Sequence, residues 1–232
     1  MIMSDKGHLF VVGTPIGNLE DITLRAISTL QNVDLILAED TRNSKKLLSA
    51  HNIDTKMMSY HEHSNEKETK RIISLLLDGK NLALISDAGT PTISDPGYGL
   101  IRDCIKKEIK IIPIPGASAI TTAMSVSGLP SDSFTFFGFL PQKKGRIKKI
   151  KELLNVDNTI ILFESPFRLE KTLNQLKEYL GNRSVVVGRE LTKLYEEIIR
   201  GNLEDVIKYF SKSKVKGEIV IMIGKDDDRI NF

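Results

Sequence analysis

Residues 9–18 read Leu9-Phe10-Val11-Val12-Gly13-Thr14-Pro15-Ile16-Gly17-Asn18, a short apolar run that ends in a turn rich in glycine and proline. The same pattern recurs at residues 82–91, 110–119 and 159–166. Such runs are typical of buried strands. Helical stretches separate them, which predicts a parallel sheet with ligands beyond the carboxyl ends of its strands. Ordinary strand–helix turns also favour Gly and Pro. With Asp87, Ser118 and Glu164 among the four turns, however, we interpret them as the walls of one small-molecule site.

The chain's length allows one large domain or two smaller ones, since it has 232 residues. We predict an N-terminal α/β domain over residues 1–118, a C-terminal α/β domain over 119–232 and a ligand cleft between them. Further strands are expected at 33–38, 134–139, 184–188 and 218–223, and helices at 21–30, 44–50, 66–77, 97–107, 119–126, 143–154, 168–180 and 203–210.

The bulk composition excludes several classes of protein. Hydrophobic residues make up 41% of the chain and charged residues 27%, as in soluble globular proteins. A single cysteine, Cys104, excludes an intrachain disulfide and suits a reducing compartment. No stretch has the length of a membrane span, and the N-terminus lacks the features of a signal peptide. We therefore expect a cytoplasmic protein with no membrane partner.

The first turn excludes the common nucleotide-binding signatures. No Gly-Lys-Ser/Thr follows Gly13-Thr14-Pro15-Ile16-Gly17, and the Gly-x-Gly-x-x-Gly spacing is missing. His61 and His63 could share one face of an extended loop, but no third metal ligand at a suitable spacing is evident. We predict no metal site.

A charged cluster, Glu39-Asp40-Thr41-Arg42, follows the strand predicted at 33–38. Adjacent carboxylates are costly to bury. One interpretation is a substrate-facing cluster with one carboxylate as a base and Arg42 on a phosphate. The alternative is a helix start in which Asp40 or Thr41 is the N-cap. The sequence leaves both open.

A basic run lies between Lys143 and Lys151, and its six cations could neutralise RNA phosphates. A solvated helix face is the usual alternative. The predicted RNA-binding residues are Lys143, Lys144, Arg146, Lys148, Lys149 and Lys151. A second charged stretch, Arg189-Glu190-Leu191-Thr192-Lys193, follows the strand at 184–188 and could orient a substrate.

Taken together, these motifs resemble the tetrapyrrole methylase family of S-adenosylmethionine enzymes, and within it the branch that methylates the 2′-oxygen of a cytidine in 16S rRNA. The resemblance spans nearly the whole chain. It rests on residues 13–19, 38–42, 86–91, 95–98, 115–116, 128–132, 138–141, 164–168, 189–193 and 217–220. The cluster from Glu39 to Arg42 points to the RNA branch rather than to corrin or sirohaem enzymes.

This chain departs from the family pattern in two places. Phe167 stands where many members have a His, which argues against a catalytic His there. Many members also carry a further C-terminal segment beyond the point that corresponds to Phe232, so we expect weakened or altered RNA engagement.

The resemblance implies two α/β domains, a homodimer and S-adenosylmethionine in the interdomain cleft. By position, the cofactor would be surrounded by Pro15, Asp87, Ala88, Gly89, Thr90, Ala117, Ser118 and Phe163. The partner would be 16S rRNA within the small ribosomal subunit.

The chemistry would be an in-line attack of a ribose oxygen on the sulfonium methyl, which mainly requires alignment and a base. Glu39 or Asp40 is the expected base or base-orienting group. Arg42 and Lys193 would contact phosphates or the developing oxyanion, and Glu164 and Arg189 are further catalytic candidates. Two alternatives remain, namely a methyltransferase acting on a tetrapyrrole and a non-catalytic RNA-binding protein with the same fold.

Overall fold

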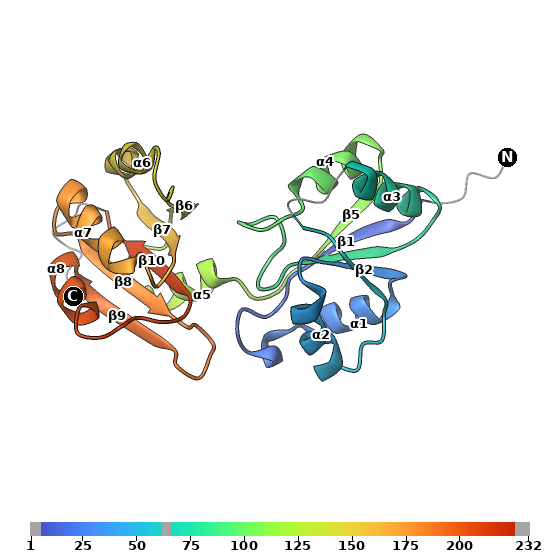
Figure 1. The fold of residues 1–232 in the computed structure, drawn as a ribbon, viewed down its shortest axis with the longest axis horizontal. Coiled ribbons are helices and arrows are strands. Elements are labelled where there is room, and N and C mark those ends of the chain that lie inside the picture. Colours follow the sequence, from blue (N-terminus) through green and yellow to red (C-terminus); the bar gives the residue numbers. More distant parts are fainter. Residues whose placement is uncertain (1–5, 62–65, 226–232) are drawn as a thin grey trace. The chain divides into compact units, whose positions relative to one another are not determined.

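The computed structural model describes residues 6–61 and 66–225. The chain divides into two compact units, Met1–Ser118 (unit 1) and Ala119–Phe232 (unit 2) (Figure 1). Within the described ranges, none of the helices combines the length and hydrophobicity needed to cross a bilayer.

Unit 1 contains a five-stranded sheet in the order β3-β2-β4-β1-β5, and every neighbouring pair is parallel. The strands are β1 (His8–Val12), β2 (Leu35–Ala38), β3 (Met57–Ser59), β4 (Leu82–Ile85) and β5 (Lys110–Ile114). The helices are η1 (Leu19–Asp21), α1 (Leu24–Asn32), α2 (Thr41–Ala50), α3 (Glu66–Leu77) and α4 (Tyr98–Lys106). The parallel sheet predicted from the apolar runs is confirmed for this unit.

Helices cover both faces of the unit 1 sheet, with α1 and α2 on one face and α3 and α4 on the other (Figure 1). Alternate strand residues such as Ala83 and Leu84 therefore belong to two separate cores. All four residues of β4 are buried. A strand buried on both faces has a continuous apolar sequence, which is why these runs stand out.

Unit 2 contains a mixed five-stranded sheet in the order β6-β7-β10-β8-β9. Its elements are α5 (Ala119–Ser127), β6 (Phe134–Phe139), α6 (Arg146–Glu152), η2 (Leu153–Asn155), β7 (Thr159–Glu164), α7 (Leu169–Leu180), β8 (Ser184–Arg189), β9 (Glu197–Asn202), α8 (Leu203–Phe210) and β10 (Ile219–Ile223). Only β6 and β7 pair in parallel. The run at 159–166 thus belongs to this second sheet and not to the sheet of the other three runs.

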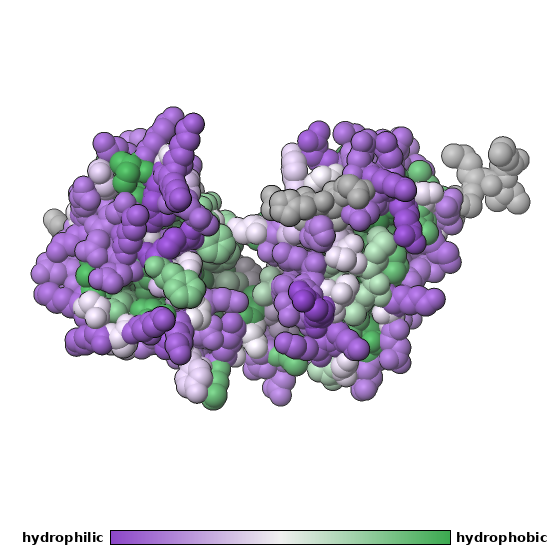
Figure 2. Space-filling view, viewed as in Figure 1, coloured by the Kyte–Doolittle hydropathy of each residue, from purple (hydrophilic) through white to green (hydrophobic). Residues whose placement is uncertain are grey.

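The sequence analysis did not predict β9. This strand pairs with β8 alone, so it is an edge strand. Only Ile198 and Ile199 are apolar in Glu197-Ile198-Ile199-Arg200-Gly201-Asn202, and Gly201 weakens the pattern further. On the face that Figure 2 shows, the surface of both units is mostly polar, with apolar residues in small patches.

Candidate functional site

Three of the four predicted turns meet at the carboxyl edge of the unit 1 sheet. The Thr14 N–H donates to the Gly89 carbonyl at 2.8 Å, and the Gly89 N–H donates to the Thr14 carbonyl at 3.1 Å. The Thr14 hydroxyl also donates to the Ser86 carbonyl at 3.2 Å. These bonds fix the turn after β1 against the turn after β4.

The turn after β5 packs against the turn after β1 through two glycines. A Cβ built on Gly13 would lie 2.8 Å from the Gly116 nitrogen, and one built on Gly116 would lie 2.7 Å from the Gly13 oxygen. Side chains other than hydrogen do not fit at such distances, so both positions require glycine unless a loop moves.

Gly89 lies where these loops come together, in the left-handed conformation that favours glycine. Its φ is +81°, and a Cβ there would point between the Ile16 side chain, at 3.5 Å, and the Ala117 carbonyl, at 3.9 Å. The predicted cofactor residues of unit 1 all lie on these loops: Pro15, Asp87, Ala88, Gly89, Thr90, Ala117 and Ser118. A glycine-lined cradle of this kind fits a ligand held mainly by backbone contacts.

Asp87 links the cradle to the charged cluster after β2. Its carboxylate accepts hydrogen bonds from the Asp40 N–H at 3.2 Å and from Asn43 Nδ2 at 2.9 Å. Its own N–H donates to Glu39 Oε2 at 3.3 Å. Burial raises the pKa of Glu39, and the charges of Asp87 and Asp40 raise it further, although the Asp87 N–H opposes them. Glu39 is therefore a stronger base than an ordinary glutamate.

Asp40 has a different environment from Glu39. It is the N-cap of α2 and accepts the Arg42 N–H at 2.8 Å. The Arg42 guanidinium donates to both of its carboxylate oxygens, at 3.0 and 2.6 Å, and these hydrogen bonds lower the pKa of Asp40 to about 2. The N-cap alternative from the sequence is therefore correct for Asp40, and such a carboxylate is a weak base.

A pocket of about 1090 Å³ opens beside Glu39. Tyr60, Asp95, Tyr98 and Lys70 are among its lining residues. Burial raises the pKa of Asp95 to about 6, and the charges of Glu39 and Asp87 also raise it, against a side-chain hydrogen bond with Ser86. The volume of the pocket is sufficient for a nucleoside.

The second histidine of the 61–63 stretch, His63, lies outside the described residues.

Asp95 is not among the site residues predicted from the sequence. The available signal was its place in the loop that follows β4, beside Pro96 and Gly97. Perturbed carboxyl groups in a pocket are typical of functional sites.

Phe163 lies in unit 2, at the carboxyl end of β7. Its ring makes an edge contact with Phe136, with the ring centroids 4.9 Å apart, and lies 5.7 Å from the Phe139 ring. Phe139 is exposed. This cluster offers an aromatic surface, but the participation of Phe163 in the same cofactor site as the unit 1 loops stays a prediction.

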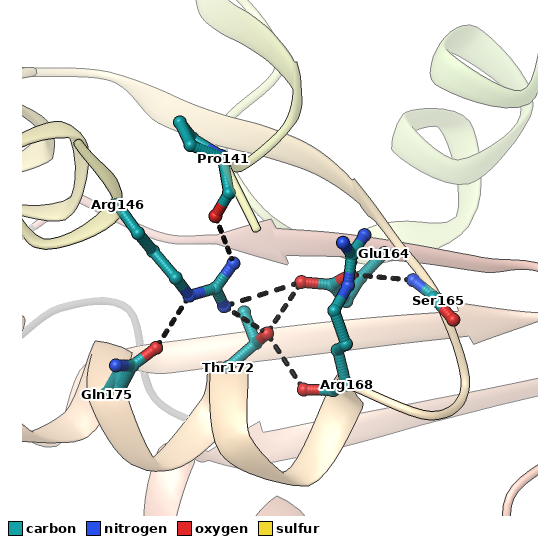
Figure 3. Close-up of polar contacts among 7 residues, drawn as sticks. All are labelled: Pro141, Arg146, Glu164, Ser165, Arg168, Thr172 and Gln175. Carbon is teal, nitrogen blue, oxygen red and sulfur yellow. Dashed lines mark hydrogen bonds and ion pairs between the residues drawn. The ribbon is translucent and has the colours of Figure 1, made fainter. Parts of the chain in front are cut away.

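Glu164, the next residue, is buried in a polar network (Figure 3). Its side chain is 1% exposed, and its carboxylate accepts hydrogen bonds from Ser165 N–H at 2.7 Å, Arg168 Nε at 2.7 Å and Thr172 Oγ1 at 2.6 Å. Arg146 Nη2 lies 3.5 Å from it. The carboxylate is thus held by internal partners, so we interpret Glu164 as a structural anchor of β7 and α7 and do not retain it as a base.

Arg146 contributes a positive charge to the network around Glu164. Its side chain is 4% exposed and donates to the Gln175 and Thr172 side chains and to the Pro141 carbonyl (Figure 3). A guanidinium satisfied and buried in this way cannot reach RNA. The expectation that Arg146 binds RNA is corrected accordingly.

The remaining cations of the basic run differ in exposure. Lys143, Lys144, Lys148 and Lys151 are exposed. Lys149 is more restrained, because its Nζ donates to Glu152 at 2.9 Å and lies 4.9 Å from the Phe137 ring centroid.

Arg189 and Lys193 are both tied to carboxylates at the end of β8. Arg189 Nε donates to Glu197 Oε2 at 2.8 Å. Lys193 Nζ lies 3.0 Å from Glu190 Oε1 and 3.1 Å from Glu218 Oε2. The predicted catalytic set is thus split, with Glu39, Asp40 and Arg42 in unit 1 and Glu164, Arg189 and Lys193 in unit 2.

Comparisons with known proteins agree with this fold. The model of the family described as Tetrapyrrole (Corrin/Porphyrin) Methylases matches residues 8–207. A relative from Halalkalibacterium halodurans, named Ribosomal RNA small subunit methyltransferase I, is 51% identical over 97% of this chain and 78% of its own length. A relative of the same name from Thermotoga maritima is 48% identical over 95% of this chain and 100% of its own.

One of the similar solved structures is a complex with a ligand. Uroporphyrin-III C-methyltransferase from Thermus thermophilus, complexed with S-adenosylhomocysteine, aligns with a TM-score of 0.65 over 94% of this chain and 97% of its own, at 17% identity. At that identity the likeness concerns the fold alone.

Proposed function

The chain belongs to the tetrapyrrole methylase family, and from this we propose that it transfers a methyl group from S-adenosylmethionine to the 2′-oxygen of a cytidine ribose in 16S rRNA. The observation that carries the proposal is the 51% and 48% identity, over nearly the whole chain, to relatives named for methylation of small-subunit rRNA. The choice of a cytidine and of its 2′-oxygen is our own step beyond those names.

The unit 1 cradle fits the cofactor. The close approach of Gly13 to Gly116, and the position of Gly89 beside Ile16 and Ala117, bring backbone groups of three loops to one place. Pro15, Asp87 and the loop from Ala88 to Thr90 would hold the cofactor, together with Ala117 and Ser118. When bound, S-adenosylmethionine supplies an electrophilic methyl group on a sulfonium.

Glu39 is our candidate for the general base. A ribose hydroxyl is a weak nucleophile, so removal of its proton during attack should accelerate the reaction. Glu39 is linked to the cradle through Asp87 and also lines the pocket that holds Asp95. We place the acceptor nucleoside in this pocket, with its hydroxyl proton moving to the Glu39 carboxylate.

Arg42 is positioned for a supporting role. Its side chain is 89% exposed. It could move from Asp40 to an RNA phosphate at little cost, since exposed ion pairs contribute little to stability. In unit 2, Lys193 and Arg189 stay candidates for contacts with RNA phosphates.

The exposed lysines of the basic run, Lys143, Lys144, Lys148 and Lys151, would hold RNA phosphates, with Lys149 in a lesser role. The homodimer, the assembled small subunit as substrate and a cytoplasmic location also belong to this proposal. The names of the relatives, which refer to small-subunit rRNA, support the location.

A methyl-transfer assay with two alternative acceptor substrates distinguishes rRNA methylation from tetrapyrrole methylation. The purified protein is incubated with labelled S-adenosylmethionine and either undermethylated small subunits or a tetrapyrrole such as uroporphyrinogen. The proposal expects label in RNA alone. Label in the tetrapyrrole alone would reject it, and cofactor binding without transfer to either would favour a non-catalytic RNA-binding protein.

A further inference from the structure

Unit 2 contains a second cavity, and among its lining residues Arg189 alone has been considered above for a functional role. Its volume is about 600 Å³, and it lies between the connection from β8 to β9 and the connection from α8 to β10. The basic run follows β6, whereas this cavity borders β9, at the opposite edge of the sheet. It is therefore separate from the surface formed by residues 143–151.

The cavity is rich in positive charge. Lys212, Lys214 and Lys216 line it and are exposed. None of the three forms an ion pair with any residue that the structure describes. Three cations within five residues, with no ion pair in the described part of the chain, attract a polyanion, because each can neutralise a phosphate and release its counterion.

The carboxylates in the cavity are already paired. Glu190 accepts from Lys193 Nζ at 3.0 Å and from the Glu218 N–H at 2.9 Å. Glu197 accepts from Arg189 and from the Tyr209 hydroxyl. These internal partners leave the three lysines as the charges that a ligand meets.

Two tyrosines give the cavity an aromatic component. Tyr195 is 69% exposed and Tyr209 is 42% exposed. The Tyr209 hydroxyl donates to Glu197, and its ring packs edge-on against Phe210 with the centroids 5.2 Å apart. Tyr209 is thus fixed, while the Tyr195 ring is free to receive a flat group on its face.

The cavity also lies at the end of the sheet where β7 ends. Ile219 pairs with Glu164 on one side and with Arg189 on the other, and Arg189 pairs with Glu197. Arg189 of β8 and Glu164 of β7 thus lie on either side of Ile219 of β10. Their backbones are two strand spacings apart, which is about 10 Å. A chain bound in the cavity can therefore continue toward the end of β7 and the aromatic cluster around Phe163.

We propose that this cavity binds a single-stranded segment of the RNA substrate, with one base stacked on Tyr195 and the adjoining phosphates on Lys212, Lys214 and Lys216. A basic groove that tracks the phosphates, combined with an aromatic ring on which a base stacks, binds single strands without sequence readout. An acidic peptide would use the lysines but would gain little from Tyr195. The identity of the RNA rests on the proposed function, but the binding chemistry does not.

The test is equilibrium binding of a fluorescein-labelled, single-stranded RNA of about 12 nucleotides, measured by anisotropy over a range of salt. The variants are Lys212→Gln/Lys214→Gln/Lys216→Gln and Tyr195→Ala. The matched controls are Lys67→Gln/Lys110→Gln/Lys171→Gln, which removes the same charge from exposed positions elsewhere, and Tyr195→Phe, which keeps the ring. Thermal unfolding of every variant shows that each one is folded.

The triple cavity variant should reduce the slope of log K against log salt by about 2, at roughly 0.7 per lost single-strand contact. Tyr195→Ala should weaken binding roughly 5- to 150-fold, and Tyr195→Phe should bind like the wild type. The proposal is overturned if the cavity triple and the control triple behave alike. It is also overturned if Tyr195→Ala binds RNA normally, or if a polyglutamate peptide of equal charge competes as well as RNA.

Methyl transfer is measured in parallel to separate this proposal from the proposed function. With small subunits as substrate, the cavity triple should raise the KM for RNA while kcat and cofactor affinity stay unchanged. If the wild type binds the RNA through the cavity but methylates no RNA, the proposed function fails and the cavity proposal stands.

Discussion

Gly13 and Gly116 approach each other so closely that a Cβ on Gly116 would lie 2.7 Å from the Gly13 oxygen. The contact joins the turn after β1 to the turn after β5. We predict that Gly116→Ala forces these turns apart, costs about 1–3 kcal/mol of stability and weakens S-adenosylmethionine binding at least about tenfold. Urea unfolding and titration calorimetry measure the two effects.

Gly99→Ala is the control for Gly116→Ala. A Cβ on Gly99 meets no atom within 4 Å, and Gly99 lies within α4. This change should stabilise the protein by about 0.5–1 kcal/mol and leave cofactor affinity unchanged. Cofactor binding by Gly116→Ala at wild-type affinity would show that the cradle is not the cofactor site.

The sequence predicted most of the fold because its signals are local. The strand β4 is buried on both faces, so its apolar run was visible without any tertiary information. The edge strand β9 was missed because pairing with β8, rather than its own pattern, stabilises it. The parallel sheet was predicted correctly for unit 1, whereas the antiparallel pairing of β10 depends on long-range contacts that periodicity does not reveal.

The site was predictable only in part, for a related reason. The positions of Glu39 and Asp87 directly after predicted strands identified them as site candidates, since the carboxyl ends of parallel strands share one edge of the sheet. Exposure was not predictable: Arg146 and Lys148 belong to one basic run, yet only Lys148 faces solvent. Asp95 was missed because its unusual pKa comes from burial and from neighbours in other loops.

Asp95 should make stability depend on pH. Its pKa is about 6 in the folded protein against an ordinary value of 3.8, so the folded state holds more protons between these values. Stability therefore falls as pH rises from about 4 to above 6. The full shift corresponds to about 3 kcal/mol, but Asp95 is only partly buried, and solvent screening reduces the expected effect to about 1 kcal/mol.

Asp95→Asn removes this titration. The variant should be more stable than the wild type at pH 8, and the difference should shrink at pH 4, where the wild-type carboxyl is protonated. Urea unfolding at the two pH values checks this. An equal difference at both values would mean that Asp95 is not the titrating group.

Glu39 and Asp40 should differ in their catalytic effect. Glu39→Gln removes the proposed base and should lower kcat by a factor of about 100 or more. Asp40→Asn removes a charge of the same sign but keeps an N-cap for α2, and should retain activity within a few-fold. Single-turnover methyl transfer to small subunits distinguishes them. Wild-type kcat in Glu39→Gln would contradict the assignment.

Arg146 and Lys148 should separate stability from RNA binding. Arg146→Met leaves the buried Glu164 carboxylate without one of its cations and should cost about 3–5 kcal/mol of stability. Lys148→Met should change stability by less than about 0.5 kcal/mol but reduce the salt slope of RNA binding by about 0.7–0.9. Urea unfolding and salt-dependent RNA binding measure these. The reverse pattern would restore Arg146 as an RNA contact.

The most direct test of the central claim is the location of the transferred methyl group. Small subunits from cells that lack this protein are incubated with it and with S-adenosylmethionine labelled in the methyl group, and their 16S rRNA is digested to nucleosides. Our account predicts that the label appears in 2′-O-methylcytidine, and that Glu39→Gln greatly slows its appearance. Label in a base, in another nucleoside or in no RNA at all would contradict it.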